Sequence, residues 1–212
     1  MIFVKMRLMH SQRLEGMMSK DWIGNKAATF ATLAASNHSK GEREVNDYYA
    51  TEPKAVELLL QKEKFSSIIL EPSCGEGHIS QVLLNSGYAV KSSDLINRGF
   101  GEVKDFFEVD EFCGDIITNP PYKIALDFVK HSLDIIPEGN KVAMFLKLQF
   151  LEGKARKEFY KENPPKKIYV ASGRLNCAKN GKFEEFKSSA VAYAWFVWEK
   201  VYQGSPEIDW IN

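Results

Sequence analysis

The chain has 212 residues, enough for one domain with short appendages, because typical domains run about 100–150 residues. A hydrophobic fraction of 44% and an aromatic fraction of 12% can build a full core, which excludes wholesale disorder. The formal net charge is zero, so no overall basicity marks a nucleic-acid-binding protein.

The charges are nevertheless unevenly distributed along the chain. Residues 44–146 hold nine basic and seventeen acidic side chains, a net charge of −8. Residues 147–187 hold eleven basic and five acidic ones, a net charge of +6. An acidic centre beside a basic segment suits a small cationic ligand and a polyanionic partner, although solvated lysine-rich surfaces give the same pattern.

The cysteine and hydrophobic patterns argue against disulfides, structural metals and membrane helices. Cys74, Cys113 and Cys177 form no CxxC pair and no Cys/His cluster, so we expect no metal and a reducing, cytoplasmic setting. No apolar run approaches the ~20 residues that a membrane helix needs. The four histidines form no evident triad with a nucleophile, and we interpret them as structural or surface residues.

The predicted elements begin after an irregular N-terminal arm, residues 1–46, of which residues 1–20 are expected to be a disordered or non-native leader. A helix is predicted to start near Thr51, the candidate N-cap, with Pro53 near its first position. The expected strands are 67–70, 88–92, 115–118, 142–148, 167–171 and 189–198, and the further helices are 78–86, 124–136 and 154–161. Residues 204–212 are expected to form a C-terminal tail.

This alternation predicts an α/β domain over residues 47–203, with a mostly parallel sheet flanked by helices. Strand 189–198 is apolar on both faces, so we expect it to be central or well covered. Ligands collect at the carboxyl ends of parallel strands. The loops after Leu70, Ser93 and Thr118 are therefore expected to share one rim.

The first of these loops, Glu71–Gly77, follows a strand and opens a helix. Gly75 and Gly77 let the backbone approach a ligand closely, and Glu71 places a carboxylate where a ligand ammonium would sit. Position 80 is Ser80, so the third glycine of the dinucleotide-binding pattern is missing. A plain strand-to-helix turn explains this loop equally well.

Two aspartates follow the glycine loop. Asp94 ends the next strand and could accept hydrogen bonds from both hydroxyls of a ribose, although a surface-loop aspartate is the simpler alternative. Asp105 could accept from an adenine amino group while Phe106 packs on the ring. Aromatic pairs such as Phe106 and Phe107 more often belong to the core.

The sequence Asn119-Pro120-Pro121-Tyr122 is the sharpest signal in the chain. Two successive prolines hold a stiff extended turn, which can aim the Asn119 side-chain oxygen and the Pro120 carbonyl oxygen at one point. Two convergent acceptors suit a planar amine with two N–H bonds. Tyr122 supplies a flat face on which the ring that bears the amine can stack.

With these motifs the sequence resembles S-adenosylmethionine-dependent amino-methyltransferases, specifically the phage and prophage type of DNA adenine-N6 methyltransferase. The resemblance covers about residues 47–198. It rests, in chain order, on Asp47-Tyr48-Tyr49-Ala50-Thr51-Glu52-Pro53, Glu71–Gly77, Asp94, Asp105-Phe106 and Asn119–Tyr122. The family implies a Rossmann-like seven-stranded sheet with helices on both faces and an antiparallel last strand, which 189–198 would fill.

The resemblance also implies a set of cofactor contacts. Thr51 and Pro53 would border the methionine end, and Asp94 would take the ribose. Asp105, or Asp110 close by, would lie at the adenine with Phe106. The loop residues that would hold the cofactor are Glu71, which replaces the commoner aspartate, Ser73, Gly75 and Gly77.

A base in duplex DNA must be flipped out to reach such a site. Phe183 could stack on the opposite face of the base, although a solvated loop is equally compatible with this segment. No large insertion follows Tyr122, so we expect short or relaxed sequence specificity. The candidate backbone contacts are the basic residues Lys154, Arg156, Lys157, Lys166, Lys167, Arg174, Lys179 and Lys182.

Three functions remain open on the sequence alone. The first is methyl transfer to adenine N6 in DNA. The second is methyl transfer to a protein glutamine or to guanine N2 of ribosomal RNA, since these are also planar amines. The third is a catalytically inactive, nucleic-acid-binding form of the fold. Methylation of cytosine C5 is disfavoured because Cys113 precedes a glycine and lies in no Pro-Cys turn.

Overall fold

The computed structural model describes residues 49–175, 177–179, 183 and 191–212. The predicted arm 1–46 and the domain boundary at residue 47 lie outside these residues. The strands in this part of the chain are β1 (Tyr49–Thr51), β2 (Ile68–Glu71), β3 (Ala89–Asp94), β4 (Glu102–Val103), β5 (Asp115–Thr118), β6 (Lys141–Lys147), β7 (Lys167–Val170), β8 (Cys177–Lys179), β9 (Tyr193–Glu199) and β10 (Glu207–Trp210). The α-helices are α3 (Pro53–Lys62), α4 (His78–Asn85), α5 (Ala125–Ile135) and α6 (Lys154–Glu162). Short 3-10 turns are η1 (Phe106–Glu108), η2 (Tyr122–Ile124) and η3 (Leu148–Leu151).

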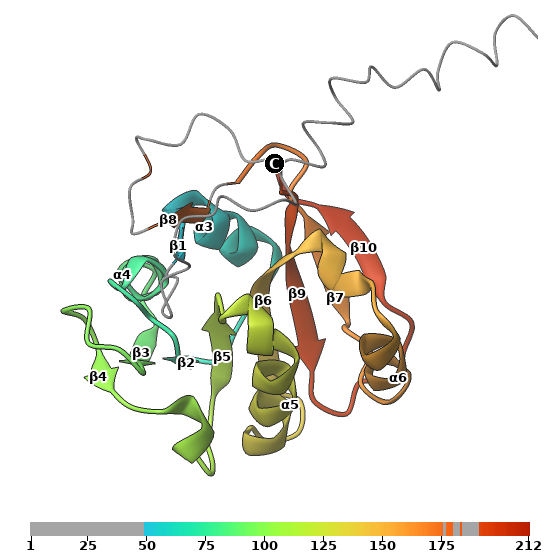
Figure 1. The fold of residues 1–212 in the computed structure, drawn as a ribbon, viewed down its shortest axis with the longest axis horizontal. Coiled ribbons are helices and arrows are strands. Elements are labelled where there is room, and N and C mark those ends of the chain that lie inside the picture. The colour runs from blue at the N-terminus through green and yellow to red at the C-terminus, as the bar shows by residue number, and fades with distance from the viewer. Residues whose placement is uncertain (1–48, 176, 180–182, 184–190) are drawn as a thin grey trace, which may run out of the picture. The chain divides into compact units, whose positions relative to one another are not determined.

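Eight of these strands form one sheet in the order β10-β7-β9-β6-β5-β2-β3-β4, which runs from right to left in Figure 1. Neighbours pair in parallel except at β9, which is antiparallel to both β6 and β7. The predicted α/β class, the mostly parallel sheet and the antiparallel strand near 189–198 are thus confirmed. The sheet has eight strands rather than the expected seven.

The additional strand at one edge of the sheet is β10, which pairs in parallel with β7. It lies in residues 204–212, which the sequence had indicated to be a tail. The side chains of Ile208 and Trp210 are 54% and 59% exposed. An exposed edge strand lacks the continuous apolar run that reveals a buried one, which is why the sequence pattern did not predict it.

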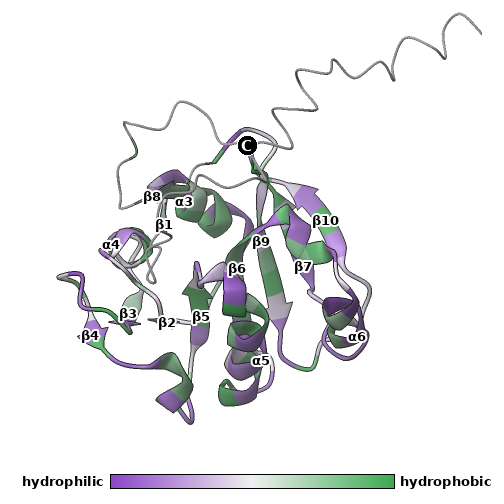
Figure 2. Cartoon of the chain, viewed as in Figure 1, coloured by the Kyte–Doolittle hydropathy of each residue, from purple (hydrophilic) through white to green (hydrophobic). Residues whose placement is uncertain are grey.

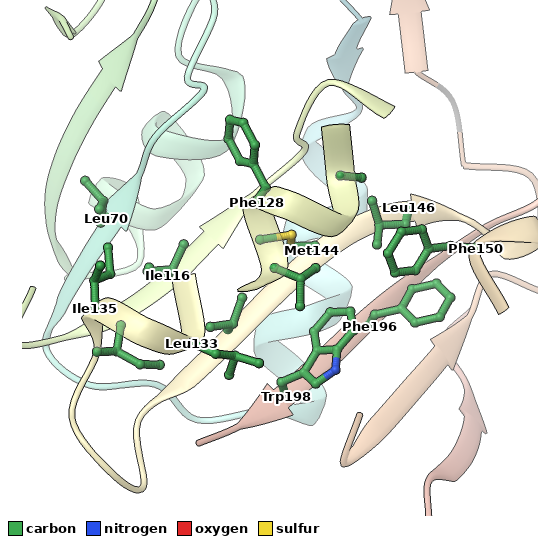
Figure 3. Close-up of a cluster of buried hydrophobic side chains, with 14 of the residues drawn as sticks. Leu70, Ile116, Phe128, Leu133, Ile135, Met144, Leu146, Phe150, Phe196 and Trp198 are labelled. Atoms are coloured by element: carbon green, nitrogen blue, oxygen red, sulfur yellow. The ribbon is translucent and has the colours of Figure 1, made fainter. Parts of the chain in front are cut away.

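The strand β9 contributes to both hydrophobic cores, as its two apolar faces predicted. Alternate side chains pack with α5 and α6 on one face of the sheet and with α3 and α4 on the other. Figure 3 shows the first of these clusters, with Phe196 and Trp198 of β9 near Met144 and Leu133. Figure 2 shows the hydrophobic colouring concentrated on the central strands and on the inner sides of the helices.

The helices are short, and none in the described ranges is long and apolar enough to cross a membrane. Helix α3 begins at Pro53, as expected, but its N-cap is Glu52 rather than Thr51. Thr51 is instead the last residue of β1, which pairs antiparallel with β8 in a separate two-stranded ribbon. The β propensity of Tyr49 and Thr51 favours this extended conformation over a cap.

Candidate active site

The predicted motifs meet at the carboxyl ends of β2, β3 and β5. Strand β2 lies between β3 and β5, so the chain order reverses at β2, and such a reversal is the position at which open α/β sheets bind ligands. The Ser73 hydroxyl lies 2.7 Å from the Thr118 hydroxyl and donates to the Asn119 carbonyl at 3.2 Å. The backbone N–H of Cys74 donates to the Ser93 carbonyl at 2.9 Å. The glycine loop therefore touches both neighbouring strand ends.

The glycines of the loop are required by its backbone. Gly75 and Gly77 have φ values of 55° and 86°, which favour glycine. A Cβ on Gly77 would lie 2.6 Å from the ring of Phe100, so even a strained substitution has no room. Gly77 is also the N-cap of α4, so the N–H groups of the first helical turn lie next to the loop.

Ser80 stands where the dinucleotide pattern has its third glycine, and it has a structural function. Its hydroxyl donates a short hydrogen bond to the Glu71 carboxyl group and lies 2.6 Å from the Ser92 hydroxyl. Burial raises the pKa of Glu71 to about 8, the Ser80 hydrogen bonds oppose this rise, and the charge of Asp94 adds to it. Glu71 is therefore largely protonated at neutral pH and binds the end of β2 to α4.

Asp94 connects the glycine loop to the loop after β3. One carboxylate oxygen accepts from the Gly75 N–H at 2.8 Å, and the other accepts from the Ile96 N–H at 2.9 Å. A carboxylate has about four acceptor positions, so both oxygens of this half-buried group can accept further hydrogen bonds. This capacity fits the predicted pair of ribose hydroxyls.

The orientation of the Asn119 side-chain amide is fixed by the contacts of its nitrogen, Nδ2. Nδ2 donates to the Tyr49 carbonyl at 3.0 Å and lies 3.7 Å from the Cys177 sulfur. The opposite atom, Oδ1, is shielded from solvent and has no hydrogen-bond partner among the described residues. A buried acceptor without a donor costs about 1–3 kcal/mol, so such an atom in a native fold calls for an explanation.

Tyr122 lies within a cluster of aromatic and cationic groups. Its ring centroid is 6.4 Å from that of Tyr49 and 6.2 Å from that of Tyr193. The Lys147 ammonium lies over the ring at 4.8 Å, and the hydroxyl lies 3.4 Å from the Cys177 sulfur. Burial is the main reason that the pKa of Tyr122 stands well above its usual range. The phenol is thus neutral and cannot serve as a base.

The two residues predicted to contact the adenine, Phe106 and Asp105, have different surroundings. The ring of Phe106 is 2% exposed and packs in the core against Phe128 and His131, at centroid distances of 4.8 and 4.7 Å. Phe106 therefore has the core role that is common for aromatic pairs, and its buried ring is not open to an adenine. Asp105 is half-buried and accepts from the Phe107 N–H at 3.0 Å, which caps the turn η1.

Of the proposed substrate contacts, Phe183 lies with its ring centroid 5.5 Å from that of His78, at the start of α4. Arg174 is exposed beyond the carboxyl end of β7. Lys179 lies in β8, and Lys182 falls outside the described residues.

Two of the lysines that were predicted to contact the DNA backbone lie far from the predicted site. Lys166 and Lys167 lie at the amino-terminal end of β7, whereas the predicted motifs lie at the carboxyl ends of the parallel strands. They form ion pairs with Glu199 and Glu207. Their place in a basic run along the sequence could not reveal which end of the strand they occupy.

Three residues of the site were not singled out from the sequence: Cys177, Lys147 and Tyr193. Lys147 ends β6, so the rule that ligands collect at carboxyl ends could have identified it. Tyr193 begins an apolar strand and resembled a core residue. Cys177 lies in a segment that appeared to be a loop, and no sequence signal connects it with Asn119.

The cofactor implied by the resemblance fits this site. Thr51, which the resemblance assigns to the methionine end, has a second buried oxygen, Oγ1, without a partner in the described part of the chain. The carboxyl ends of β2 and β3 also offer a glycine backbone, helix N–H groups and the Asp94 carboxylate. Within the described ranges, no three His, Cys, Asp or Glu side chains are grouped so that they could hold a metal ion.

Comparison with known proteins establishes the fold but no family. No protein-family model matches the chain. The septation ring formation regulator EzrA of Staphylococcus aureus is 30% identical over 100 residues, which are 46% of this chain and 17% of EzrA. The chain thus spans only a small part of that relative, and the likeness assigns it to no family.

Three solved structures have a similar fold. A Pyrococcus horikoshii protein assigned as an RNA methyltransferase has a TM-score of 0.55 and 15% identity, over 80% of this chain and 96% of that one. The methyltransferase subunit of a type I restriction-modification system from Streptococcus thermophilus has a TM-score of 0.55 and 14% identity, over 75% and 46% of the two chains. A modification subunit from Vibrio vulnificus, assigned to a type I restriction enzyme, has a TM-score of 0.53 and 10% identity, over 86% and 49%. The chain spans less than half of each type I subunit, and its fold is the Rossmann-like fold of methyltransferases.

Proposed function

We propose that the protein transfers a methyl group from S-adenosylmethionine to the exocyclic N6 amine of adenine in DNA, with short or relaxed sequence specificity. The observation that carries this proposal is the buried, unpartnered Oδ1 of Asn119, whose amide is oriented by the Tyr49 carbonyl. An amine donor would satisfy this acceptor. The type I restriction-modification subunits of similar fold support DNA as the substrate class.

In this proposal the chain acts by positioning and by electrostatics. When bound, S-adenosylmethionine supplies an electrophilic methyl group. The Asn119 side-chain oxygen and the Pro120 carbonyl accept the two N–H bonds of the amine, so that the nitrogen becomes pyramidal and its lone pair points at the methyl carbon. The two acceptors also stabilise the positive charge that develops on nitrogen. The new N–C bond replaces the S–C bond, and the nitrogen then loses a proton to solvent.

Tyr122 is proposed to stack on the target base. The Lys147 ammonium lies over the ring of Tyr122, so a base on that face would displace it. A displaced lysine beside a flipped nucleotide is well placed to contact a phosphate. Arg174, Lys179 and Phe183 remain proposed substrate contacts. Thr51, Pro53, Glu71, Ser73, Gly75, Gly77, Asp94 and Asp105 remain the proposed cofactor contacts.

The proposal is tested by incubating the protein with methyl-labelled S-adenosylmethionine and, separately, with DNA, RNA or cell protein. We expect label in DNA, and N6-methyladenine after its digestion to nucleosides. Label in protein alone, or in RNA alone, would contradict the assignment to DNA and favour a glutamine or a guanine N2 acceptor. Label in none of the three would favour an inactive, nucleic-acid-binding protein.

A further inference from the structure

Cys177 lies behind the Asn119–Tyr122 turn and contacts both of its functional side chains. It is 3% exposed, and its sulfur lies 3.7 Å from Asn119 Nδ2 and 3.4 Å from the Tyr122 hydroxyl. The Tyr193 hydroxyl also interacts with the thiol. Burial is the main cause that raises the pKa of Cys177 to about 11, so the group is a neutral thiol and not a reactive thiolate.

The position of Cys177 depends on the ribbon of β1 and β8. In this ribbon Tyr49 is opposite Lys179, and Thr51 is opposite Cys177. The two strands therefore supply one acceptor each for Asn119 Nδ2: the Tyr49 carbonyl from β1 and the Cys177 sulfur from β8. An asparagine NH₂ group has two hydrogens, and the ribbon offers a partner to both.

This arrangement selects one of the two orientations of the amide. If the amide were flipped, Oδ1 would face the Tyr49 carbonyl oxygen, and two acceptors would repel each other. The observed orientation turns Oδ1 away from the ribbon, where it has no partner among the described residues. The Cys177 sulfur also contacts the Tyr122 hydroxyl, so the same atom contacts both the Asn119 amide and the Tyr122 side chain.

We propose that Cys177 is a positioning residue for methyl transfer, which holds the Asn119 amide with Oδ1 toward the target amine and fixes the Tyr122 ring beside it. This inference rests on the proposed function, because it assigns no reaction of its own. It gives the β1–β8 ribbon a role in the transfer step rather than in substrate affinity.

The test compares Cys177→Ala, which removes the sulfur, with Cys177→Ser, which returns a polar acceptor of similar size. Cys113→Ala is the matched control, since Cys113 is exposed in the loop before β5. We expect Cys177→Ala to lower kcat roughly ten-fold, because small misplacements of reacting groups reduce rates strongly. The KM for DNA and the affinity for S-adenosylmethionine should stay within about two-fold. Cys177→Ser should recover most of kcat, and the control should equal the wild type.

A second readout does not require activity. In ¹⁵N NMR spectra, the side-chain NH₂ signal of Asn119 should shift and exchange faster with solvent in Cys177→Ala than in Cys113→Ala. An unchanged kcat, or an unchanged Asn119 signal, would overturn the inference. A parallel fall of kcat and Tm in both the Ala and the Ser variants would also overturn it, because it would indicate a packing role only. A wild-type chain that methylates no substrate contradicts the proposed function instead, and the NMR comparison still decides the role of Cys177.

Discussion

The two ends of the parallel strands hold buried polar groups in contrasting surroundings. At the amino-terminal edge, by which we mean the side of the sheet where the parallel strands begin, Asp115 has a buried carboxylate. It accepts hydrogen bonds from the backbone N–H groups of Ser66 and Lys141 and from the Asn140 side chain. Three donors around one carboxylate leave little hydrogen-bonding capacity unused. The Asp115 carboxylate is thus held almost entirely by groups of the protein itself.

The carboxyl edge, where the parallel strands end, holds buried polar atoms without hydrogen-bond partners in the described ranges. Asn119 Oδ1 and Thr51 Oγ1 are buried there without partners among the residues that the structure describes. Glu71 is buried at the same edge and has its pKa raised to about 8. The polar groups at this end therefore carry an energetic penalty that a bound ligand could relieve.

The lysines differ between the two edges in the same way. At the amino-terminal edge, they are neutralised in ion pairs: Lys141 with Glu63, Lys166 with Glu199, and Lys167 with Glu207. At the carboxyl edge, Lys147 lies over an aromatic ring and belongs to no ion pair of the described residues. The ammonium groups of Lys141, Lys166 and Lys167 are thus neutralised within the protein, whereas that of Lys147 is available to a ligand. Changes at the two edges should affect stability and activity separately.

The largest effect is expected at Asn119. Asn119→Ala should reduce methyl transfer to DNA by about 10²–10³-fold, because it removes a positioned group that stabilises developing charge. Affinity for S-adenosylmethionine, measured by calorimetry, should stay close to that of the wild type. Transfer at the wild-type rate would show that the site is misassigned.

Asp115→Ala should give the converse result. It leaves two backbone N–H groups and an amide without their acceptor, so the free energy of unfolding should fall by about 3 kcal/mol. Urea denaturation measures the loss, and Asp134→Ala at an exposed position of α5 is the control. The folded fraction of the variant should methylate DNA at the normal rate. A selective loss of activity would break the contrast between the two edges.

Glu71 should make stability depend on pH. Its folded pKa, about 8, is raised above the usual 4.5, so the folded state holds a proton that the unfolded state releases between these values. The stabilisation is full below pH 4.5 and is lost as pH rises toward 8. Between pH 5 and 7 the free energy of unfolding should fall by about 2–3 kcal/mol from this group.

Glu71→Gln should abolish that slope, whereas Glu57→Gln, at an exposed position of α3, should retain it. Urea denaturation at a series of pH values measures both. Identical slopes in the wild type and Glu71→Gln would contradict the protonated state of Glu71.

The smallest effect is expected at Lys147. Lys147→Gln should weaken DNA binding and reduce the slope of log K against log salt by about one, because one phosphate contact is lost. Lys166→Gln, which alters an ion-paired lysine at the other edge, should leave the slope unchanged. Fluorescence anisotropy with labelled DNA gives both slopes. Equal slopes for the two variants would remove Lys147 from the proposed contacts.

Much of the fold could be predicted from the sequence, because buried elements have strong patterns. The continuous apolar run of β9 indicated a strand covered on both faces, and Pro53 marked the first turn of α3. The edge strand β10 and the three-residue ribbon strands were not predictable. These strands have only three or four residues each, and their extended conformation depends on partners distant in the sequence.

The site could be predicted only in part, for a similar reason. Asn119, Gly75 and Asp94 lie next to strand ends, so local patterns indicate the edge that they share. Cys177 contacts Asn119 across 58 positions, and no local pattern encodes such a contact. Phe106 shows the reverse limitation, because its neighbours in sequence suggested a ligand and its packing places it in the core.

The position of β9 has a consequence for biosynthesis. This strand inserts between β6 and β7, although it is made after both of them. A nascent chain that has not reached Tyr193 therefore exposes the edges of β6 and β7. Their unpaired backbone N–H and C=O groups can then pair with strands of other chains. The sheet can be completed only after β9 (Tyr193–Glu199) has left the ribosome, so a deletion that removes part of β9 should prevent β6 and β7 from joining one sheet.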